Sequence, residues 1–352
     1  VNLAAWANDP TKANNLAFGN LGIVNGDVAV QGWLYDVSNA ENPQILGKQY
    51  REKATADNAR DIAHQFANDI VNRLSPGVAS IFQTKIYFVH AAGKGGNKEI
   101  WVMDYDGNNA HPLTHLGTIA LSPRPSPDNT RVAFSSMTSS GWQIRMYSLE
   151  LGRLVSFPSS GGTNISPAWS TDGHLAFSSS RNGDPEIYVC NQDGGDMRRV
   201  TAFHGPDVSP TWNPKTNTQI AWVTGRNRLP QIFEMESDGT NPQQLTDEGY
   251  AVSPSWSPNG MFLTFSWNRK YGPGAPGGQD IYVFDISSKK YIQLTHGEGS
   301  NDFPSWAPDG RHIVFQSNRG GSDQIWSMLA DGSNPVQLTH GGLNTQPAWS
   351  WK

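Results

Sequence analysis

Residues 253–260, SPSWSPNG, form a phrase that recurs along the chain and decides the fold. The other copies are SPRPSPDN at 122–129, SPAWSTDG at 166–173, SPTWNPK at 209–215, FPSWAPDG at 303–310 and QPAWSW at 346–351. The first prolines of successive copies are separated by 44, 43, 44, 50 and 43 residues. A period of about 40–45 residues is typical of the four-stranded blades of a β-propeller.

Each part of the phrase has a physical role. The second half, Ser-Pro-x-Gly, places proline and glycine where a type I turn favours them, which predicts a tight hairpin. The earlier proline has no N–H and predicts an edge strand, which in a propeller is the innermost strand. The tryptophan two residues later can bury on the order of 200 Å² between neighbouring blades. A second recurring dipeptide, Asp-Gly at 106–107 and 331–332, predicts type I′ hairpins.

The last copy of the phrase ends almost at the end of the chain, after Trp349. Three strand-like segments without a first strand occur earlier, at 85–89, 99–103 and 110–114. We therefore expect the C-terminal strand to supply the missing innermost strand and to close the ring, which removes exposed sheet edges. The predicted fold is mainly β, with a six-bladed β-propeller over residues 81–352.

Residues 1–80 contain no copy of the phrase and predict a separate small α/β domain. The expected strands are 16–24, 27–37 and 44–51, and the first two flank Asn25-Gly26, a hairpin signal. Apolar residues at helical spacing predict a helix over 57–74. We expect this domain to be incomplete at its start, because three strands and one helix leave one face of the sheet thinly covered unless residues 1–15 supply a further helix.

Composition narrows the classes of function. The chain has 26 basic and 31 acidic residues and no basic cluster, so we expect no nucleic-acid partner. No apolar run approaches the roughly 18 residues of a membrane span, so we expect no direct membrane insertion. The single cysteine, Cys190, excludes an internal disulfide framework. No secretory signal begins at Val1, which is compatible with a mature chain, a fragment or a cytosolic protein.

The motifs in the sequence give little support for catalysis or metal binding. No Gly-x-Ser-x-Gly sequence is present, which argues against a built-in serine hydrolase. The glycine-rich run 272–277 matches the dinucleotide fingerprint only formally, because prolines interrupt it and it lies between two strands. Histidines of the recurring Leu-Thr-His, at His115, His296 and His340, are expected around the perimeter, too far apart to share a metal. We therefore predict no catalytic residues, no metal and no cofactor.

The mouth of the central channel is the remaining candidate site. In a meander, each crossover into a first strand opens on one face, so residues just before the repeated prolines should surround the mouth. The partner-binding residues predicted there are Thr163, Asn164, Asp207, Tyr250, Asn301, Asp302, Asn344 and Thr345. Two alternatives stay open: these side chains only solvate the crossovers, or Asp207 and Asp302 bind a cation.

The whole pattern resembles the TolB family of the Tol-Pal system. The likeness rests on the Pro-x-Trp-Ser-Pro-Asp-Gly, Ile-Tyr-x-x-x-x-Asp-Gly and Leu-Thr phrases, together with GWLYDV at 32–37, TKIYFV at 84–89 and the stretch over 46–74. The propeller phrases alone are less specific, because peptidase-associated propellers share them. Pro125 departs from the pattern, since it stands where the other phrases have tryptophan, and it should weaken one contact between blades.

The resemblance implies a non-enzymatic, monomeric periplasmic scaffold. In that family the channel-mouth face receives the peptidoglycan-associated lipoprotein Pal, which supports outer-membrane integrity and constriction at cell division. A mobile N-terminal tail reaches the inner-membrane protein TolA, and we expect that contact region to be absent from this chain. One alternative is a propeller enzyme, either a lyase or the partner of a peptidase, that acts at the channel. The other is a carbohydrate or peptidoglycan sensor, which would have exposed aromatic residues at the mouth.

Overall fold

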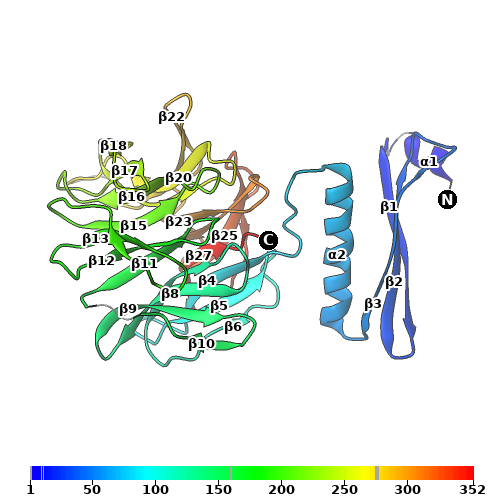
Figure 1. The fold of residues 1–352 in the computed structure, drawn as a ribbon. Helices are drawn as coiled ribbons and strands as arrows, with labels where there is room; N and C mark the ends of the chain where they lie inside the picture. Colours follow the sequence, from blue (N-terminus) through cyan, green and yellow to red (C-terminus); the bar gives the residue numbers. More distant parts are fainter. Residues whose placement is uncertain (1, 9, 11, 159–160, 274–276) are drawn as a thin grey trace. The chain divides into compact units, whose positions relative to one another are not determined.

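The structure is a computed structural model that describes residues 2–8, 10, 12–158, 161–273 and 277–352. Part of the glycine-rich run, residues 274–276, lies outside the described residues. The chain divides into two compact units, Val1–Gln83 and Thr84–Lys352 (Figure 1). The fold is mainly β, as the sequence predicts.

The first unit contains a three-stranded antiparallel sheet and two helices. Its strands, paired in the order β1-β2-β3, are β1 (Asn15–Val24), β2 (Asp27–Asp36) and β3 (Gln44–Lys53), and its helices are α1 (Leu3–Ala7) and α2 (Ala56–Leu74). Asn25 and Gly26 have φ values of 52° and 78°, which are typical of a type I′ turn. The predicted hairpin and the predicted long helix are therefore confirmed.

Helix α2 packs against β2 and β3. Thr55 caps its N-terminus, because the hydroxyl of Thr55 accepts the N–H of Asn58 at 3.1 Å. Ile62 of the helix lies in a buried cluster with residues of both strands. A side chain at Gly32 would come within 2.7 Å of the Phe66 ring, so the helix lies directly on the backbone of the sheet there. On β1, by contrast, Leu21 is exposed.

The second unit contains six four-stranded sheets in the described part of the chain. Their first strands are β7 (Ala120–Pro125), β11 (Asn164–Trp169), β15 (Asp207–Trp212), β19 (Tyr250–Trp256), β23 (Asn301–Trp306) and β27 (Leu343–Trp349). Their second strands, in the same order, are β8 (Arg131–Thr138), β12 (Leu175–Ser179), β16 (Gln219–Thr224), β20 (Phe262–Asn268), β24 (His312–Ser317) and β4 (Lys85–Ala91).

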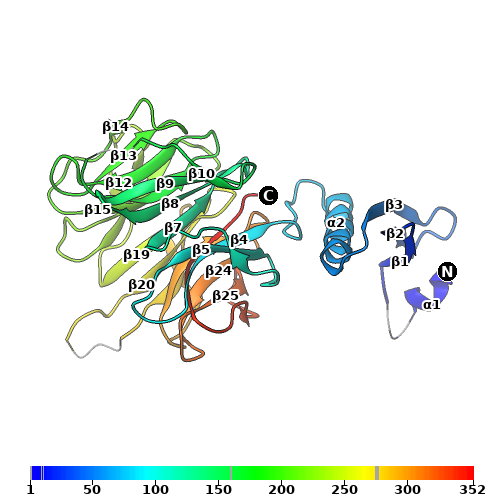
Figure 2. The same cartoon turned by 90° about the horizontal axis from the view of Figure 1, so that it is seen from below.

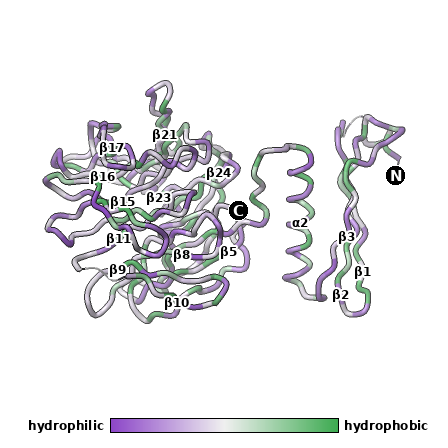
Figure 3. The backbone as a smooth tube through the Cα atoms, viewed as in Figure 1, coloured by the Kyte–Doolittle hydropathy of each residue, from purple (hydrophilic) through white to green (hydrophobic). Residues whose placement is uncertain are grey.

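The outer two strands of each sheet are shorter on average. The third strands are β9 (Gly141–Ser148), β13 (Glu186–Cys190), β17 (Gln231–Glu236), β21 (Asp280–Asp285), β25 (Gln324–Leu329) and β5 (Glu99–Asp104). The fourth strands are β10 (Arg153–Val155), β14 (Arg198–Arg199), β18 (Gln243–Gln244), β22 (Lys290–Gln293), β26 (Val336–Gln337) and β6 (His111–Pro112). In Figure 3 the hydrophobic segments of this unit lie mostly on the strands and the hydrophilic ones mostly on the loops.

Five sheets are meanders of consecutive strands, and the sixth combines the two ends of the second unit. In that sheet, ordered β27-β4-β5-β6, Leu343–Trp349 pairs antiparallel with Lys85–Ala91. Strand β27 lies beside β4 in Figure 1, as the interrupted last copy of the phrase predicts. Each first strand contacts the first strand of the next sheet, and β27 contacts β7, so these contacts run in a ring (Figure 2).

A β-bulge interrupts every first strand at the repeated proline. The residue before the proline has a φ value between 51° and 56° in all six strands, namely at Ser122, Ser166, Ser209, Ser253, Phe303 and Gln346. A bulge inserts one unpaired residue and therefore shifts the alternation of side chains between the two faces of the strand. The alternation of side chains between the two faces therefore cannot be counted continuously across the bulge.

Of the two recurring turns, one was predicted correctly and the other was not. Gly260 N–H donates to Ser257 O at 2.9 Å, which confirms the tight hairpin after the first strand. The type I′ prediction for Asp-Gly is wrong, because only the glycine of each pair has a positive φ. Gly332 is instead the last residue of a four-residue turn, with its N–H donating to Leu329 O at 2.9 Å.

The tryptophans of the phrase lie between neighbouring sheets, as predicted. Trp169, Trp212, Trp256, Trp306 and Trp349 are each at most 8% exposed. Trp169, for example, packs with Ala133 and Met146 of the preceding sheet. At Pro125, where the tryptophan is missing, the indole N–H of Trp351 donates to the proline carbonyl at 3.2 Å. The end of the chain thus contacts the strand that lacks the tryptophan.

The recurring Leu-Thr phrase, which reads Val-Thr at residues 200–201, fixes the outer part of five of the six sheets. Its threonine hydroxyl accepts the N–H of a residue near the start of the third strand at 2.8 to 2.9 Å, at Thr114, Thr201, Thr246, Thr295 and Thr339. Four of these hydroxyls also donate to a carboxylate or amide oxygen, of Glu99, Glu186, Asp280 and Gln324. The phrase is therefore a buried hydrogen-bonding device.

Candidate functional site

The crossovers into the first strands, together with the loops between second and third strands, form the candidate site, called here the crossover face. Half of the residues predicted to bind a partner there are buried. Asn164, Asp207, Asn301 and Asn344 are 2%, 0%, 0% and 2% exposed. All four stand three residues before the repeated proline, on the far side of the bulge. Their predicted exposure is wrong, because the bulge turns this position toward the interior.

The three buried asparagines hold the crossovers in place. Asn301 accepts from the guanidinium of Arg319 at 2.9 Å and donates to Gln279 O at 3.3 Å. Asn344 donates to Gln324 Oε1 at 2.8 Å, and its own oxygen lies 2.8 Å from His90 Nδ1. Each of these side chains thus links one sheet to the next. Their first role is to stabilise the ring.

Asp207 stands at the same position of its repeat as these asparagines, but its side chain ends in a carboxyl group instead of an amide. Within the described residues neither of its carboxylate oxygens has a hydrogen-bond partner, and Arg226 Nη2 lies 3.5 Å from Oδ2. Burial, together with the negative charge of Asp207, raises the pKa of Glu186 on the neighbouring sheet. Two carboxyl groups therefore meet here, whereas at most one carboxyl group stands at the equivalent positions of the other sheets.

The structure does not bring Asp207 and Asp302 together. They lie on β15 and β23, and β19 stands between these strands in the ring. Asp302 Oδ1 accepts the N–H of Phe303 at 2.7 Å, and burial raises the pKa of the Asp302 carboxyl. Across the residues that the structure describes, no group of three or more His, Cys, Asp or Glu side chains could hold a metal ion.

The other predicted residues reach the surface. Thr163 is exposed, and Tyr250, Asp302 and Thr345 are half-buried. The ring of Tyr250 lies 5.3 Å from that of Tyr271, which is 53% exposed. This pair presents an aromatic surface on the crossover face. Such a surface suits contact with another molecule.

A row of arginines on the crossover face was missed by sequence reasoning. Arg181, Arg226, Arg269 and Arg319 each follow a second strand and stack over aromatic rings. Arg226, for example, lies 3.8 Å from the centroid of Phe203, which is itself exposed. Arg269 also pairs with the Glu248 carboxylate at 2.6 Å. The signal was present in the sequence, because an arginine recurs after the second strand in four repeats.

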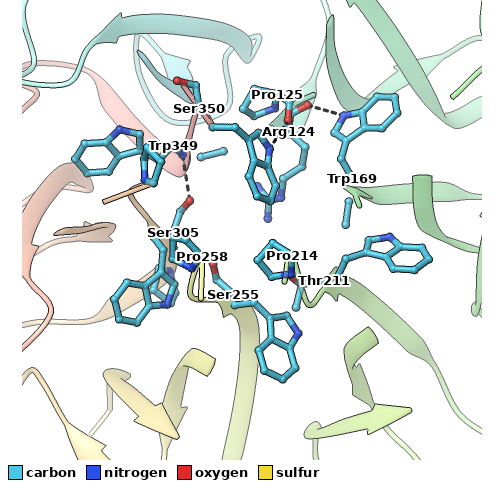
Figure 4. A pocket seen from close by; sticks show the side chains of 18 of the residues that line it. Arg124, Pro125, Trp169, Thr211, Pro214, Ser255, Pro258, Ser305, Trp349 and Ser350 are labelled. Carbon is cyan, nitrogen blue, oxygen red and sulfur yellow. Dashed lines mark hydrogen bonds between the residues drawn. The ribbon is translucent and has the colours of Figure 1, made fainter. Parts of the chain in front are cut away.

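Two cavities lie inside the ring of first strands. One, of about 350 Å³, is lined by residues of all six first strands around the bulges, including Ser122, Ser209 and Phe303. The other, of about 100 Å³, is lined by the tryptophans of the phrase and the small residues beside them (Figure 4). Arg124 and Pro254 line both cavities.

An outer groove of about 510 Å³ lies on the crossover face at the fourth repeat. Its lining includes Glu248, Arg269 and Asp280 beside the aromatic side chains of Trp267 and Tyr282. The groove thus offers charges of both signs next to rings. Hydrogen bonding and stacking of a partner's side chains are the interactions that this arrangement supports.

Comparison with known proteins identifies the family. A family model described as the TolB beta propeller domain matches residues 72–272 and 247–352. The chain belongs to the TolB propeller family. A curated TolB homolog from Chlorobium chlorochromatii is 36% identical over 210 residues, which cover 60% of this chain and 46% of that protein. The chain thus spans about half the length of this curated relative.

Two solved structures have a similar fold. TolB from Acinetobacter baumannii superposes with a TM-score of 0.83 and 22% identity, over 99% of this chain and 86% of that one. The hydrazine synthase of Kuenenia stuttgartiensis covers 77% of this chain and 47% of its own at a TM-score of 0.62 and 14% identity. Both similarities concern the fold alone. None of the helices among the described residues has the length and apolar character needed to cross a membrane.

Proposed function

We propose that this member of the TolB family is a non-enzymatic scaffold of the Tol-Pal system in the periplasm. Its second unit acts as a closed six-bladed propeller, and the crossover face binds the peptidoglycan-associated lipoprotein Pal. Through this contact the protein supports outer-membrane integrity and constriction at cell division. The observation that carries the proposal is the family match, which extends continuously over residues 72–352.

Several features support a closed, rigid ring as the platform for binding. First strands contact one another in a complete circle, and the C-terminal strand pairs with β4. Buried asparagines link adjacent sheets at the crossovers. A rigid surface lowers the entropy lost on association, because few side chains and loops must become ordered.

Of the residues predicted to bind a partner, we keep as direct contacts only those that reach the surface. We propose Thr163, Tyr250, Asp302 and Thr345 as contacts, with Tyr271 and the arginine row as additions. Tyrosine and arginine are enriched among the residues that contribute most to binding energy at interfaces. Asn164, Asp207, Asn301 and Asn344 act indirectly in this proposal, by holding the crossovers that carry the contact residues.

The remaining parts of the proposal concern the whole protein. Residues 1–80 form an independent α/β domain and residues 81–352 the propeller domain, and the protein is a monomer. The protein needs no cofactor and breaks no covalent bond.

Calorimetry with the soluble domain of Pal, without its lipid anchor, tests the proposal. The intact chain should bind Pal saturably, and Tyr250→Lys should weaken binding about tenfold or more, because it places a charge in the aromatic pair. Ile292→Lys is the matched control, since Ile292 is 50% exposed on the outermost strand β22 and should leave affinity unchanged. Absence of saturable binding by the wild-type chain would contradict the proposed function.

A further inference from the structure

Arg124 is an exception among the residues inside the ring. The residue after the repeated proline is small in the other five phrases, at Ala168, Thr211, Ser255, Ser305 and Ala348. All five line the cavity of about 100 Å³, and in the sixth phrase Arg124 takes the same position. In Figure 4 the Arg124 side chain extends between the rings of this cavity. Arg124 also lines the larger cavity, so it stands where the two meet.

The guanidinium of Arg124 has no anionic partner within the described residues. Its Nη1 donates to the carbonyl of Pro123 at 2.8 Å, which uses one of its five N–H groups. The Arg124 carbonyl, in turn, accepts the indole N–H of Trp169 at 3.1 Å, which fixes the backbone beneath the side chain. Most donors of the guanidinium are therefore available to a ligand in the cavities.

The electrostatic surroundings agree with the geometry. Burial lowers the pKa of Arg124 to about 10, and no carboxylate opposes this change. Burial also lowers the pKa of Arg319 on the crossover face, but the charges of Glu298 and Asp280 oppose the shift there. Arg124 is half-buried and stays protonated at neutral pH, and no carboxylate compensates its charge, so pairing with an anion would be favourable.

The wall of the smaller cavity adds further donors. Thr211, Ser255 and Ser305 carry hydroxyl groups, line the same cavity and stand at the position of Arg124 in their own phrases. Ser305 Oγ accepts the N–H of Trp349 at 3.1 Å, which leaves its own proton to donate. A water molecule occupies about 30 Å³ of liquid, so about 100 Å³ has room for a few waters or for one small anion.

We propose that the ring holds a small oxyanion, a carboxylate or an inorganic phosphate, on the Arg124 guanidinium. The planar fork of arginine binds such groups through two parallel hydrogen bonds. Hydroxyl groups of the opposite wall complete the shell of donors. The site lies inside the ring and is independent of Pal binding on the crossover face.

Titration calorimetry of the intact chain with acetate and with inorganic phosphate, at constant ionic strength in chloride, tests this proposal. We expect saturable binding of at least one of them, and the two arms distinguish a carboxylate from a phosphate ligand. Arg124→Gln should weaken binding about tenfold or more, because a hydrogen bond to a charged group contributes about 1.5–3 kcal/mol. Arg153→Gln, at an exposed position on β10, is the matched control and should bind as the wild type does.

Thermal unfolding supplies a second readout that does not depend on heats of binding. The saturating anion should raise the Tm of the wild type but not that of Arg124→Gln. In buffer without the anion, Arg124→Gln should unfold at the same temperature as the wild type or higher, because it removes an uncompensated, half-buried charge. Arg124→Lys keeps the charge without the fork and should show intermediate affinity. Binding by neither anion, or equal binding by Arg124→Gln, would overturn the proposal.

Discussion

Replacing Thr201 by valine tests whether the threonine of the recurring phrase, which reads Val200-Thr201 here, stabilises the ring. The Thr201 hydroxyl is buried, accepts the N–H of Ile187 at 2.8 Å and donates to Glu186 at 2.6 Å. Valine has nearly the same shape but no hydroxyl, so two buried polar groups lose their partner. Each buried group left unpaired costs about 1–3 kcal/mol, and Thr201→Val should therefore lower the free energy of unfolding by about 2–5 kcal/mol.

Thr246→Val is the informative comparison. Thr246 accepts the N–H of Ile232 at 2.9 Å, and its hydroxyl donates to no carboxylate or amide within the described residues. Only one polar group should lose its partner, at a cost of about 1–3 kcal/mol. Thr218→Val is the control, because Thr218 is exposed on the turn before β16 and should have little effect.

Differential scanning calorimetry is the assay. At about 2 °C per kcal/mol for a unit of this size, Thr201→Val should lower the Tm by roughly 4–10 °C and Thr246→Val by roughly 2–6 °C. The order of the two is the decisive result. If both lowered the Tm as little as Thr218→Val does, the hydroxyls would not be stabilising the sheets, and the reasoning would be refuted.

Two further predictions concern the interior of the ring. Burial raises the pKa of Glu186, so the folded state binds a proton more tightly than the unfolded state and wild-type stability falls as the pH rises through that pKa. Glu186→Gln should thus be more stable than the wild type at pH 8 and lose this advantage at pH 4, as urea midpoints would reveal; a larger advantage in acid would reverse the sign. Trp256→Ala removes a side chain that is 5% exposed between two sheets and should cost about 3–5 kcal/mol, whereas Trp351→Ala, at a half-buried position, should cost less. Equal losses in denaturant unfolding would show that Trp256 does not act as a wedge.

Strand order, the pairing of β27 with β4 and the place of the tryptophans could be predicted from the sequence. These features depend on local signals, such as proline, glycine and the spacing of Trp256 from Pro254, that repeat with each sheet. Repetition also makes the prediction more reliable, because a strand with a weak signal in one copy of the repeat can be recognised from the other copies. Pro125 shows the limit of this approach, because the tryptophan that contacts it, Trp351, comes from the other end of the chain and could not be paired with it from local signals.

The orientation of the crossover residues could not be predicted in the same way. An alternation of two, counted from the buried Trp306 through Pro304, would place Asn301 on the opposite face, toward solvent. The bulge at Phe303, with its φ of 51°, shifts the count by one and buries Asn301 instead. Serine, phenylalanine and glutamine all occur at the bulged position, and the proline that follows it fits a regular edge strand as well as a bulge, so the sequence did not distinguish the two.

The location of the partner is the most direct test of the central claim that the crossover face is a docking surface. Amide hydrogen exchange of the intact chain should be measured with and without the soluble domain of Pal. The account predicts slower exchange in the crossover loops around residues 161–163, 269–273 and 298–302 and unchanged exchange in the turns around 170–173, 257–260 and 307–310. Protection of those turns, with the crossover loops unaffected, would contradict it.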